Sequence, residues 1–227
     1  MYMNVVKLGR MRYQEALKIQ EKLLDMRLNN YCEDTLLLVE HPHVITLGKR
    51  GKVENILLPV DELKRTGTEI CEVNRGGDVT YHGPGQIVGY PIMDLKNHGR
   101  DVRRFIHNIE EIFIMLLDKE YGITAGRISE HTGVWVGQEK ITAIGFAIKH
   151  WVTMHGFAFN VNTDLDCFKW IVPCGITDKG VTSIQKLLNK QQDYENAVNL
   201  VIRYFSKVFG ISPVLNEIKT ILGKEGN

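Results

Sequence analysis

The sequence predicts an α/β (α+β) fold in which helices pack around a mixed β-sheet. Three observations support this prediction. Short runs of apolar residues typical of buried strands alternate along the chain with longer segments whose apolar residues recur at helical spacing. A chain of 227 residues exceeds the commonest domain size, yet α/β domains often reach this length undivided. Apolar residues make up 44% of the chain, which is ample for a core.

The first elements are two strand segments separated by a helix. A short strand at Asn4–Leu8 precedes Tyr13–Arg27, where apolar residues lie largely on one side with charges between them, as in an amphipathic helix. The apolar run Thr35–Glu40 is of the buried-strand type, and it ends at Pro42 because proline cannot donate to the next ladder bond. Val44–Leu47 continues as another strand.

The second half repeats the alternation. Strands are expected at Glu69–Val73 and Ile87–Ile92, on either side of a glycine-rich stretch. A long helix follows and stops before Gly122. That helix spans Val102–Tyr121. A hairpin is expected from Thr132–Val136 and Lys140–Ile148, and a third strand beside it at Val152–Val161. The last helix spans Tyr194–Phe209. We predict one domain over residues 1–227, with a C-terminal helical region from about residue 194.

Charge and cysteine content exclude several classes of function. Lys and Arg total 28 against 27 Asp and Glu, so no global charge attracts nucleic acid or a membrane surface. The four cysteines contain no CxxC pair, and no cluster of histidines and carboxylates has ligand spacing, so no metal is predicted. The N-terminus lacks the pattern of a secretory signal, and no segment approaches the ~18 apolar residues that span a bilayer. A cytoplasmic protein with free thiols is expected.

Cys174 is the first candidate for chemistry. It lies between a proline and a glycine, directly after an apolar stretch, in Trp170-Ile-Val-Pro-Cys-Gly-Ile176. Such a setting displays a thiol to a group that approaches from outside. The competing interpretation is a small buried side chain, which is the usual state of a free cysteine.

The most informative segment is Arg75-Gly-Gly-Asp-Val-Thr-Tyr-His-Gly-Pro-Gly-Gln86. Four glycines let the backbone approach a ligand closely and present N–H groups to it. The spacing matches neither a dinucleotide fingerprint nor a P-loop, so no motif supports nucleotide binding. A simple turn between strands would need the glycines and the proline, but it has no use for Arg75, Tyr81 and His82 together.

Four ordered motifs carry a resemblance to a known family. They are the glycine-rich segment from Arg75 to Gln86, Lys140-Ile-Thr-Ala-Ile-Gly145, His155-Gly-Phe-Ala-Phe-Asn160 and Pro173-Cys-Gly-Ile176. Together with Leu36–Pro42 and Thr46–Gly48, they resemble the octanoyl-acyl carrier protein:protein octanoyltransferases, also called lipoyl(octanoyl) transferases. The resemblance covers about residues 35 to 185. It implies the fold shared with lipoate and biotin protein ligases.

The resemblance also implies roles for particular residues. Cys174 would be the acyl-thioester nucleophile, and Lys140 the basic partner that lowers its pKa. Where members of the family commonly have a basic residue, this chain has Phe146 and Ala147. The residues implied to bind the octanoyl group are Arg75, Gly76, Gly77, Asp78, Val79, Thr80, Tyr81, His82, Ala143, Ile144, Gly145, Gly156, Phe157 and Ala158.

The implied reaction takes octanoyl from the phosphopantetheine thiol of acyl carrier protein and passes it to a lysine amine. The implied acceptors are lipoyl domains of 2-oxoacid dehydrogenases and the glycine cleavage H protein. Exchange between thioesters is nearly isoenergetic and formation of the amide is downhill, so neither ATP nor any other cofactor is expected.

The chemistry is coherent on residue types alone. A thiol with an ordinary pKa of ~8.5 is only a few per cent thiolate at neutral pH, and a nearby lysine would raise that fraction. Lys140 would act either as an ammonium beside the thiolate or as a neutral base. Backbone N–H groups at Gly175 and around Gly76 and Gly77 are candidate oxyanion donors. Two alternatives stay open: a lipoate or biotin ligase that forms an adenylate, and a non-catalytic module that binds an acyl group or a carrier protein.

Overall fold

The computed structural model describes residues 1–175 and 178–223, apart from the side chain of Cys174. A large mixed sheet crosses the molecule in the strand order β12-β1-β2-β6-β10-β9-β8-β7, with β11 paired to β9 outside this path. A small sheet has the order β4-β3-β5. Strand β1 pairs in parallel with both β2 and β12, whereas β2, β6, β10, β9 and β8 pair antiparallel in turn. The mixed sheet with packed helices predicted from the sequence is confirmed.

The strands of the large sheet are β1 (Tyr2–Arg10), β2 (Thr35–Glu40), β6 (Gln86–Ile92), β7 (Gly126–Ile128), β8 (His131–Val136), β9 (Glu139–Lys149), β10 (Val152–Asn160), β11 (Gly180–Val181) and β12 (Ser212–Leu215). The small sheet contains β3 (Val44–Leu47), β4 (Glu69–Glu72) and β5 (Val79–His82). The α-helices are α1 (Tyr13–Leu28), α2 (Val60–Arg65), α3 (Val102–Tyr121), α4 (Ile184–Leu188), α5 (Tyr194–Phe209) and α6 (Ile218–Leu222).

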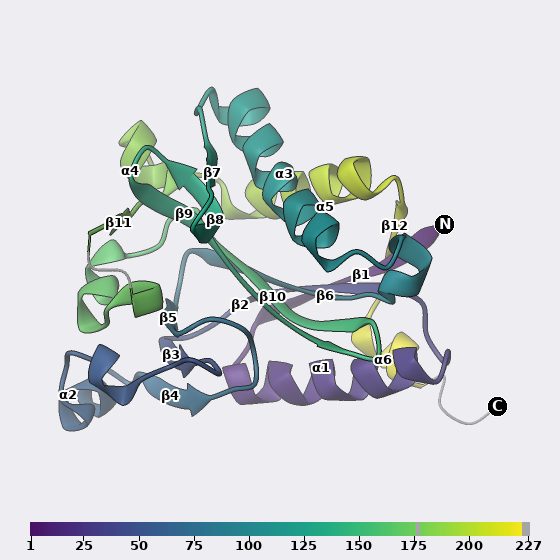
Figure 1. Ribbon diagram of the computed structural model, residues 1–227, viewed down its shortest axis with the longest axis horizontal. Coiled ribbons are helices and arrows are strands. Elements are labelled where there is room, and N and C mark those ends of the chain that lie inside the picture. The colour runs from purple at the N-terminus through teal and green to yellow at the C-terminus, as the bar shows by residue number, and fades with distance from the viewer. Residues whose placement is uncertain (176–177, 224–227) are drawn as a thin grey trace.

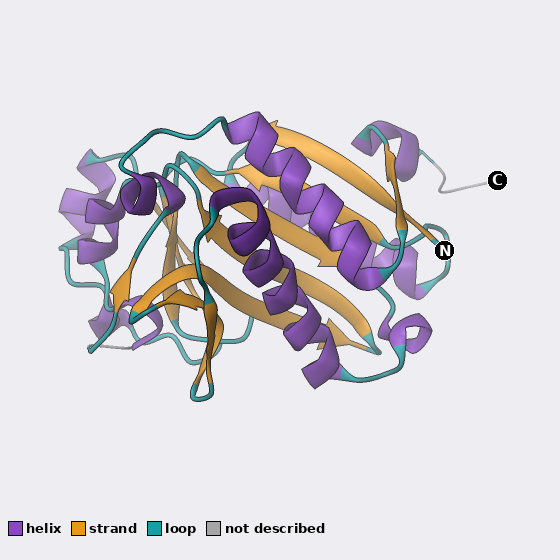
Figure 2. Cartoon of the chain, turned by 90° about the horizontal axis from the view of Figure 1, so that it is seen from above, coloured by secondary structure: helices purple, strands orange, loops and turns teal. Residues whose placement is uncertain are grey.

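Helices cover both faces of the large sheet. Helix α1 lies along one face, and α3 and α5 lie together on the other (Figure 1, Figure 2). Successive residues of a strand therefore enter different cores, because strand side chains alternate between faces. Leu36 and Leu38 of β2 pack in the core beneath α3 and α5, whereas Leu37 and Val39 pack in the core beneath α1.

The two long helices of the second face begin and end where their local sequence directs. The side chain of Asp101 accepts a hydrogen bond from the backbone N–H of Arg104, and Asp193 does the same for Asn196. Each helix ends at a left-handed glycine, Gly122 or Gly210. The predicted bounds of α3 and α5 are confirmed.

The small sheet packs at one end of the molecule, below the large sheet in Figure 1. Its core contains Val79 and Tyr81 of β5, together with Ile45, Leu63 and Phe168. The sequence predicts only a glycine-rich loop where β5 forms. The strand survives there because Val79, Thr80, Tyr81 and His82 are all buried and pair antiparallel with β3.

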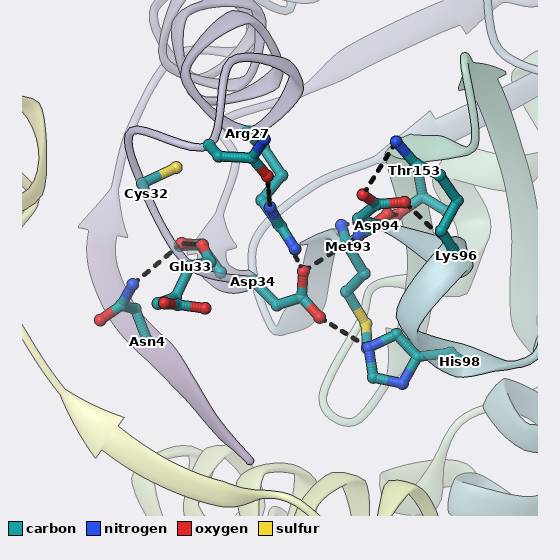
Figure 3. Close-up of polar contacts among 12 residues, drawn as sticks. Asn4, Arg27, Cys32, Glu33, Asp34, Met93, Asp94, Lys96, His98 and Thr153 are labelled. Atoms are coloured by element: carbon teal, nitrogen blue, oxygen red, sulfur yellow. Dashed lines mark hydrogen bonds and ion pairs between the residues drawn. The ribbon is translucent and has the colours of Figure 1, made fainter.

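A buried polar cluster ties the far end of α1 to the sheet (Figure 3). Asp34 precedes β2, and its Oδ1 accepts hydrogen bonds from Arg27 Nε at 2.8 Å and from the backbone N–H of Asp94 at 3.0 Å. Its Oδ2 lies 2.6 Å from His98 Nε2. Burial opposes ionisation of Asp34, but the hydrogen bonds from His98 and Arg27 outweigh it and lower the pKa of the carboxyl.

Candidate active site

A cavity lies between the large sheet, the start of α1 and the glycine-rich loop that precedes β5. Its empty volume is about 470 Å³, including the open mouth, and most of its lining is apolar. It is lined by Tyr13, Arg75, Gly76, Gly77, Asp78, Thr80, His82, Val88, Tyr90, Ala143, Ile144, Gly145, His155, Gly156, Phe157 and Ala158. An apolar cavity with a few convergent polar groups suits a ligand that has an apolar chain and one polar end.

Glycines allow the loop over the cavity to lie directly on the sheet. The backbone N–H of Gly76 donates to the carbonyl of Phe146 in β9 at 2.9 Å. A Cβ added to Gly145 would lie 2.8 Å from the Gly76 carbonyl oxygen. At Gly156 an added Cβ would collide with the carbonyl of Gly89 in the neighbouring strand β6. Any side chain at Gly145 or Gly156 would therefore push apart backbone segments that form the walls of the cavity.

Arg75 fixes the position of this loop from beneath. Its side chain is buried, with Nη2 donating to the Thr46 carbonyl at 2.7 Å and Nη1 donating to the Gly76 carbonyl at 3.0 Å. A second bond from Nη2 reaches Thr46 Oγ1 at 2.9 Å. The guanidinium thereby joins β3 to the glycine-rich loop and places a positive charge beside the cavity.

Three histidines near Arg75 are buried: His41, His82 and His155. Burial, together with the charge of neighbouring His41, lowers the pKa of His82 to about 3. Burial also lowers the pKa of His41 to about 4 and that of His155 to about 4, with Arg75 adding to the effect on His155. All three imidazoles are therefore neutral at pH 7.

His155 departs from the extended backbone of its strand, with φ at +61°. Its Nε2 lies 2.5 Å from Asn74 Oδ1, so Nε2 carries the proton and donates. Its Nδ1 is buried and has no hydrogen-bond partner among the described residues. The His155 ring thus holds Asn74, the residue before Arg75, while its Nδ1 remains an acceptor in the cavity wall without a partner among the described residues.

Lys140 lies on β9, three residues before Ala143 of the cavity lining. Its Nζ donates to the Thr132 carbonyl at 3.2 Å and lies 4.7 Å from the centroid of the Trp135 ring. Gly133 leaves space for it, because an added Cβ there would touch the Lys140 methylenes at 3.4 Å. The amino group of Lys140 is held against the sheet rather than extended into solvent, and only 8% of the residue is exposed.

The chain that follows Cys174 pairs with the strand that contains Lys140. Pro173–Gly175 forms a 3-10 turn, and the following strand β11 pairs with β9 so that Val181 lies opposite Lys140. The side chain of Cys174 and residues 176–177 lie outside the described part of the chain.

Asp78 connects this turn to the cavity. Its Oδ2 accepts from Asn55 Nδ2 at 2.7 Å, and the Asn55 carbonyl accepts from the backbone N–H of Val172 at 2.8 Å. Gly175 has φ at +67°, and an added Cβ would lie 2.7 Å from Asp78 Oδ2. The carboxylate of Asp78 therefore lies against the turn that contains Cys174.

The structure brings most of the sequence-predicted residues together. Twelve of the fourteen residues expected to bind the acyl group line the cavity, and Val79 and Tyr81 do not. The side chains of these two point into the core of the small sheet, where the Tyr81 hydroxyl lies 2.7 Å from His43 Nδ1. Phe146 packs against the main core, with its ring centroid 4.9 Å from that of Phe105.

Sequence reasoning missed Tyr13, Val88, Tyr90 and His155 as lining residues. His155 stands directly before Gly156 in a motif that the sequence displays, so its position was a usable signal. Tyr13 gave none, because only the packing of α1 on the sheet brings it to the cavity.

Within the described residues, no group of three or more His, Cys, Asp or Glu side chains is arranged to hold a metal ion. None of the helices in that part of the chain is both long and apolar enough to cross a membrane.

Comparisons with known proteins agree with this architecture. The model of the lipoyl protein ligase A/B catalytic domain family matches residues 12–206. An octanoyltransferase of Desulforamulus reducens is 57% identical over 99% of this chain and 100% of its own length. The crystal structure of lipoate-protein ligase A bound with ATP superposes with a TM-score of 0.77 at 17% identity, over 99% of this chain and 94% of its own. Biotin protein ligase from Aquifex aeolicus, in complex with biotin and ATP, gives a TM-score of 0.57 at 13% identity, over 91% and 70%.

Proposed function

We propose that Cys174 carries the octanoyl group between two proteins. The premise is that this chain belongs to the octanoyltransferase family and has a lipoyl protein ligase A/B catalytic domain. The donor in this proposal is octanoyl-acyl carrier protein, and the acceptor is the lysine of a lipoyl domain. Octanoyl transfer in lipoate biosynthesis is the activity of the family. The route through a thioester on this chain is the part that requires a test.

The observation that carries the proposal is that the segment around Cys174 contacts both the strand of Lys140 and a residue of the cavity lining. The β11–β9 register sets Val181 opposite Lys140, and Asp78 lies against Gly175 while it also lines the cavity. This arrangement supports a pairing of Cys174 with Lys140. The apolar lining beyond, with Val88, Ile144 and Phe157 among its members, supports a place for the octanoyl tail.

In the first half-reaction the Cys174 thiolate attacks the carbonyl carbon of the donor thioester. A new C–S bond forms, the bond to the carrier's sulfur breaks, and the released thiol takes up the proton that Cys174 gave up. Two of the N–H groups expected from the sequence to stabilise the oxyanion of the tetrahedral intermediate are already used: that of Gly175 donates to the Val172 carbonyl at 3.0 Å and that of Gly76 to the Phe146 carbonyl at 2.9 Å. The N–H of Gly77 is the remaining candidate in this proposal.

In the second half-reaction the neutral lysine amine of the acceptor attacks the Cys174 thioester. The C–N bond of the amide forms, the C–S bond breaks, and the surplus proton of the amine returns to the thiolate, directly or through Lys140. The same pair of residues thus serves both directions of proton transfer. No step needs ATP, because the acyl group arrives already activated as a thioester.

The acceptors in this proposal are lipoyl domains of 2-oxoacid dehydrogenases and the glycine cleavage H protein. A cytoplasmic site of action and the absence of a cofactor requirement belong to the same proposal.

Intact mass measurement tests the nucleophile. The wild-type protein is expected to gain one octanoyl group when it is incubated with octanoyl-acyl carrier protein without ATP. Cys174→Ala should gain none, whereas Cys167→Ala, which removes the buried thiol nearest in sequence, should gain as much as wild type. An adduct of equal mass on Cys174→Ala would refute the assignment, and a strict requirement for ATP would favour a ligase.

Lys140 is tested by the pH dependence of thiol alkylation. Removal of a nearby ammonium raises the pKa of a thiol, and each unit slows alkylation at pH 7 by about tenfold. Lys140→Ala should therefore shift the iodoacetamide profile of Cys174 to higher pH and slow octanoyl transfer at least equally. Lys140→Arg should restore the alkylation rate but not proton exchange. Overlapping profiles of Lys140→Ala and wild type would show that Lys140 does not tune this thiol.

A further inference from the structure

A short basic loop lies at the rim of the cavity, between β3 and the 3-10 turn that begins at Val53. It reads Gly48-Lys-Arg-Gly-Lys52, and the side chains of Lys49, Arg50 and Lys52 are exposed. Across the described chain, none of these three cations forms an ion pair with a carboxylate. Three uncompensated charges within four positions create a local positive potential on a protein whose net charge is only +1.

The loop is fixed in place by its backbone. The N–H groups of Gly48, Lys49 and Arg50 donate to the carbonyls of Asp78, Arg75 and Gly77 at 3.1, 3.0 and 3.1 Å. The N–H of Lys52 donates to Asp78 Oδ1 at 3.3 Å. An added Cβ at Gly48 would lie 2.5 Å from the Gly77 carbonyl oxygen, which shows how closely the two loops pack. The backbone of Lys49, Arg50 and Lys52 is therefore held against residues that line the cavity, while their side chains are exposed.

The same anchor reaches the turn that contains Cys174. Asp78 binds the Lys52 N–H through one oxygen and Asn55 Nδ2 through the other, and Asn55 accepts from Val172. The charged loop and the Cys174 turn are thus two sides of one hydrogen-bonded unit centred on Asp78.

Two lysines near the Cys174 turn are already paired. Lys179 lies 3.7 Å from an oxygen of Asp178, and Lys186 lies 2.5 Å from one of Glu139. The loop 48–52, by contrast, concentrates three exposed cations beside the residues that line the cavity. An anionic partner that approaches this mouth would be attracted there first.

A nucleotide cradle does not fit this loop. Phosphate loops bind through free backbone N–H groups that point at the ligand. Here the N–H groups of Lys49, Arg50, Gly51 and Lys52 all donate to protein oxygens. Only the long side chains are left to meet an anion, which suits an electrostatic contact with a protein surface or a single phosphodiester.

We propose that Lys49, Arg50 and Lys52 form the docking surface for the anionic face of the acyl donor: the phosphodiester of its pantetheine arm and the acidic carrier surface beside it. This inference rests on the proposed function, because it presumes that the acyl group arrives on such a carrier. Rim charges of this kind steer encounter and raise the association rate, and salt weakens their effect.

The test compares donors of increasing negative charge. The triple variant Lys49→Gln, Arg50→Gln, Lys52→Gln is assayed with octanoyl-pantetheine, octanoyl-4′-phosphopantetheine and octanoyl-acyl carrier protein. With the carrier protein, the second-order rate of Cys174 acylation should fall by about 10- to 100-fold at low salt, and the fall should shrink as salt is added. With neutral octanoyl-pantetheine the rate should match wild type. A fall of the same size with the phosphorylated arm as with the carrier protein would show that the phosphate of the arm alone accounts for the effect and would overturn the part assigned to the carrier surface.

A charge-matched control removes three exposed cations elsewhere, Lys18, Arg103 and Lys149. This control should keep the wild-type rate with all three donors. An equal loss with charged and neutral donors, or no loss with the carrier protein, would overturn the proposal. A wild-type protein that no donor acylates would instead refute the proposed function, so the two failures are distinguishable.

Discussion

Helix α1 covers two buried polar clusters, and the polar atoms of one are more fully hydrogen-bonded than those of the other. Around Asp34, at the far end of the helix, both carboxylate oxygens have hydrogen-bond partners from Arg27, Asp94 and His98 (Figure 3). In the cavity wall, His155 Nδ1 lacks a partner within the described chain, as does Nε2 of Gln20, whose Oε1 accepts from the His155 N–H at 3.1 Å; His155 also has a left-handed backbone. Native proteins seldom leave buried groups unpaired without a reason. The contrast indicates that the first cluster serves stability and the second serves binding.

The largest effect is expected from Asp34→Ala. The substitution leaves the Arg27 guanidinium buried without its carboxylate and removes the acceptor of the Asp94 N–H. Breaking a buried pair from one side costs about 3–5 kcal/mol of unfolding free energy. Urea unfolding should show this loss, while the folded protein should transfer octanoyl at the wild-type rate. The exposed neighbour Glu33→Ala is the control, with an expected change of about 0.5 kcal/mol or less. If Asp34→Ala slowed transfer without loss of stability, the division between the clusters would be wrong.

Mild acid should separate the clusters without mutation. The pKa values of His41, His82 and His155 are lowered from 6.5 to about 4, 3 and 4. Between pH 6.5 and about 4 the unfolded state therefore binds more protons than the folded state, and stability falls as pH falls. Each histidine contributes up to about 1.4 kcal/mol per pH unit.

Asp34 acts in a different pH window. Its folded pKa is lowered, so its contribution is complete above the ordinary carboxyl pKa of ~3.9 and is lost only in stronger acid. A loss of stability between pH 7 and pH 5 in urea titrations would thus come from the cavity side, and His82→Gln should reduce the slope by about one proton. A constant stability over that range would contradict the assignment.

Local sequence was enough to predict the elements that local chemistry specifies. The bounds of β2, β3, α3 and α5 follow from short apolar runs or from a helical apolar face that ends at a glycine. Motif positions likewise predicted most of the cavity lining, since the loop at Arg75 and the strands at Gly145 and Gly156 are each continuous in sequence.

What the sequence did not predict depends on contacts between distant residues. Strand β5 was hidden by the glycines on both sides, because its pairing with β3 decides its structure. The Asp34 cluster joins residues 27, 34, 94 and 98, whose spacing has no regular period. Tyr13 reaches the cavity only because α1 packs on the sheet.

The smallest and most specific effect is expected from matched substitutions at the two clusters, His98→Asn and His155→Asn. At His98 the shorter side chain no longer reaches Asp34 Oδ2, and an unpaired buried carboxylate oxygen costs about 1–3 kcal/mol. At His155 the backbone is left-handed, a conformation that asparagine tolerates better than most residues, so relief of strain offsets part of the lost bond to Asn74. We expect His155→Asn to change stability by about 1 kcal/mol or less.

The two substitutions should affect donor binding in the opposite order to their effects on stability. Without its tie to His155, Asn74 no longer fixes the loop at Arg75, so the KM for the octanoyl donor should rise about fivefold, which is about 1 kcal/mol of binding, while kcat stays near wild type. His98→Asn should leave both constants unchanged and lower only the melting temperature. A His155→Asn protein that melts as early as His98→Asn and keeps the wild-type KM would show that His155 is a structural residue, and that its bond to Asn74 plays no part in holding the donor.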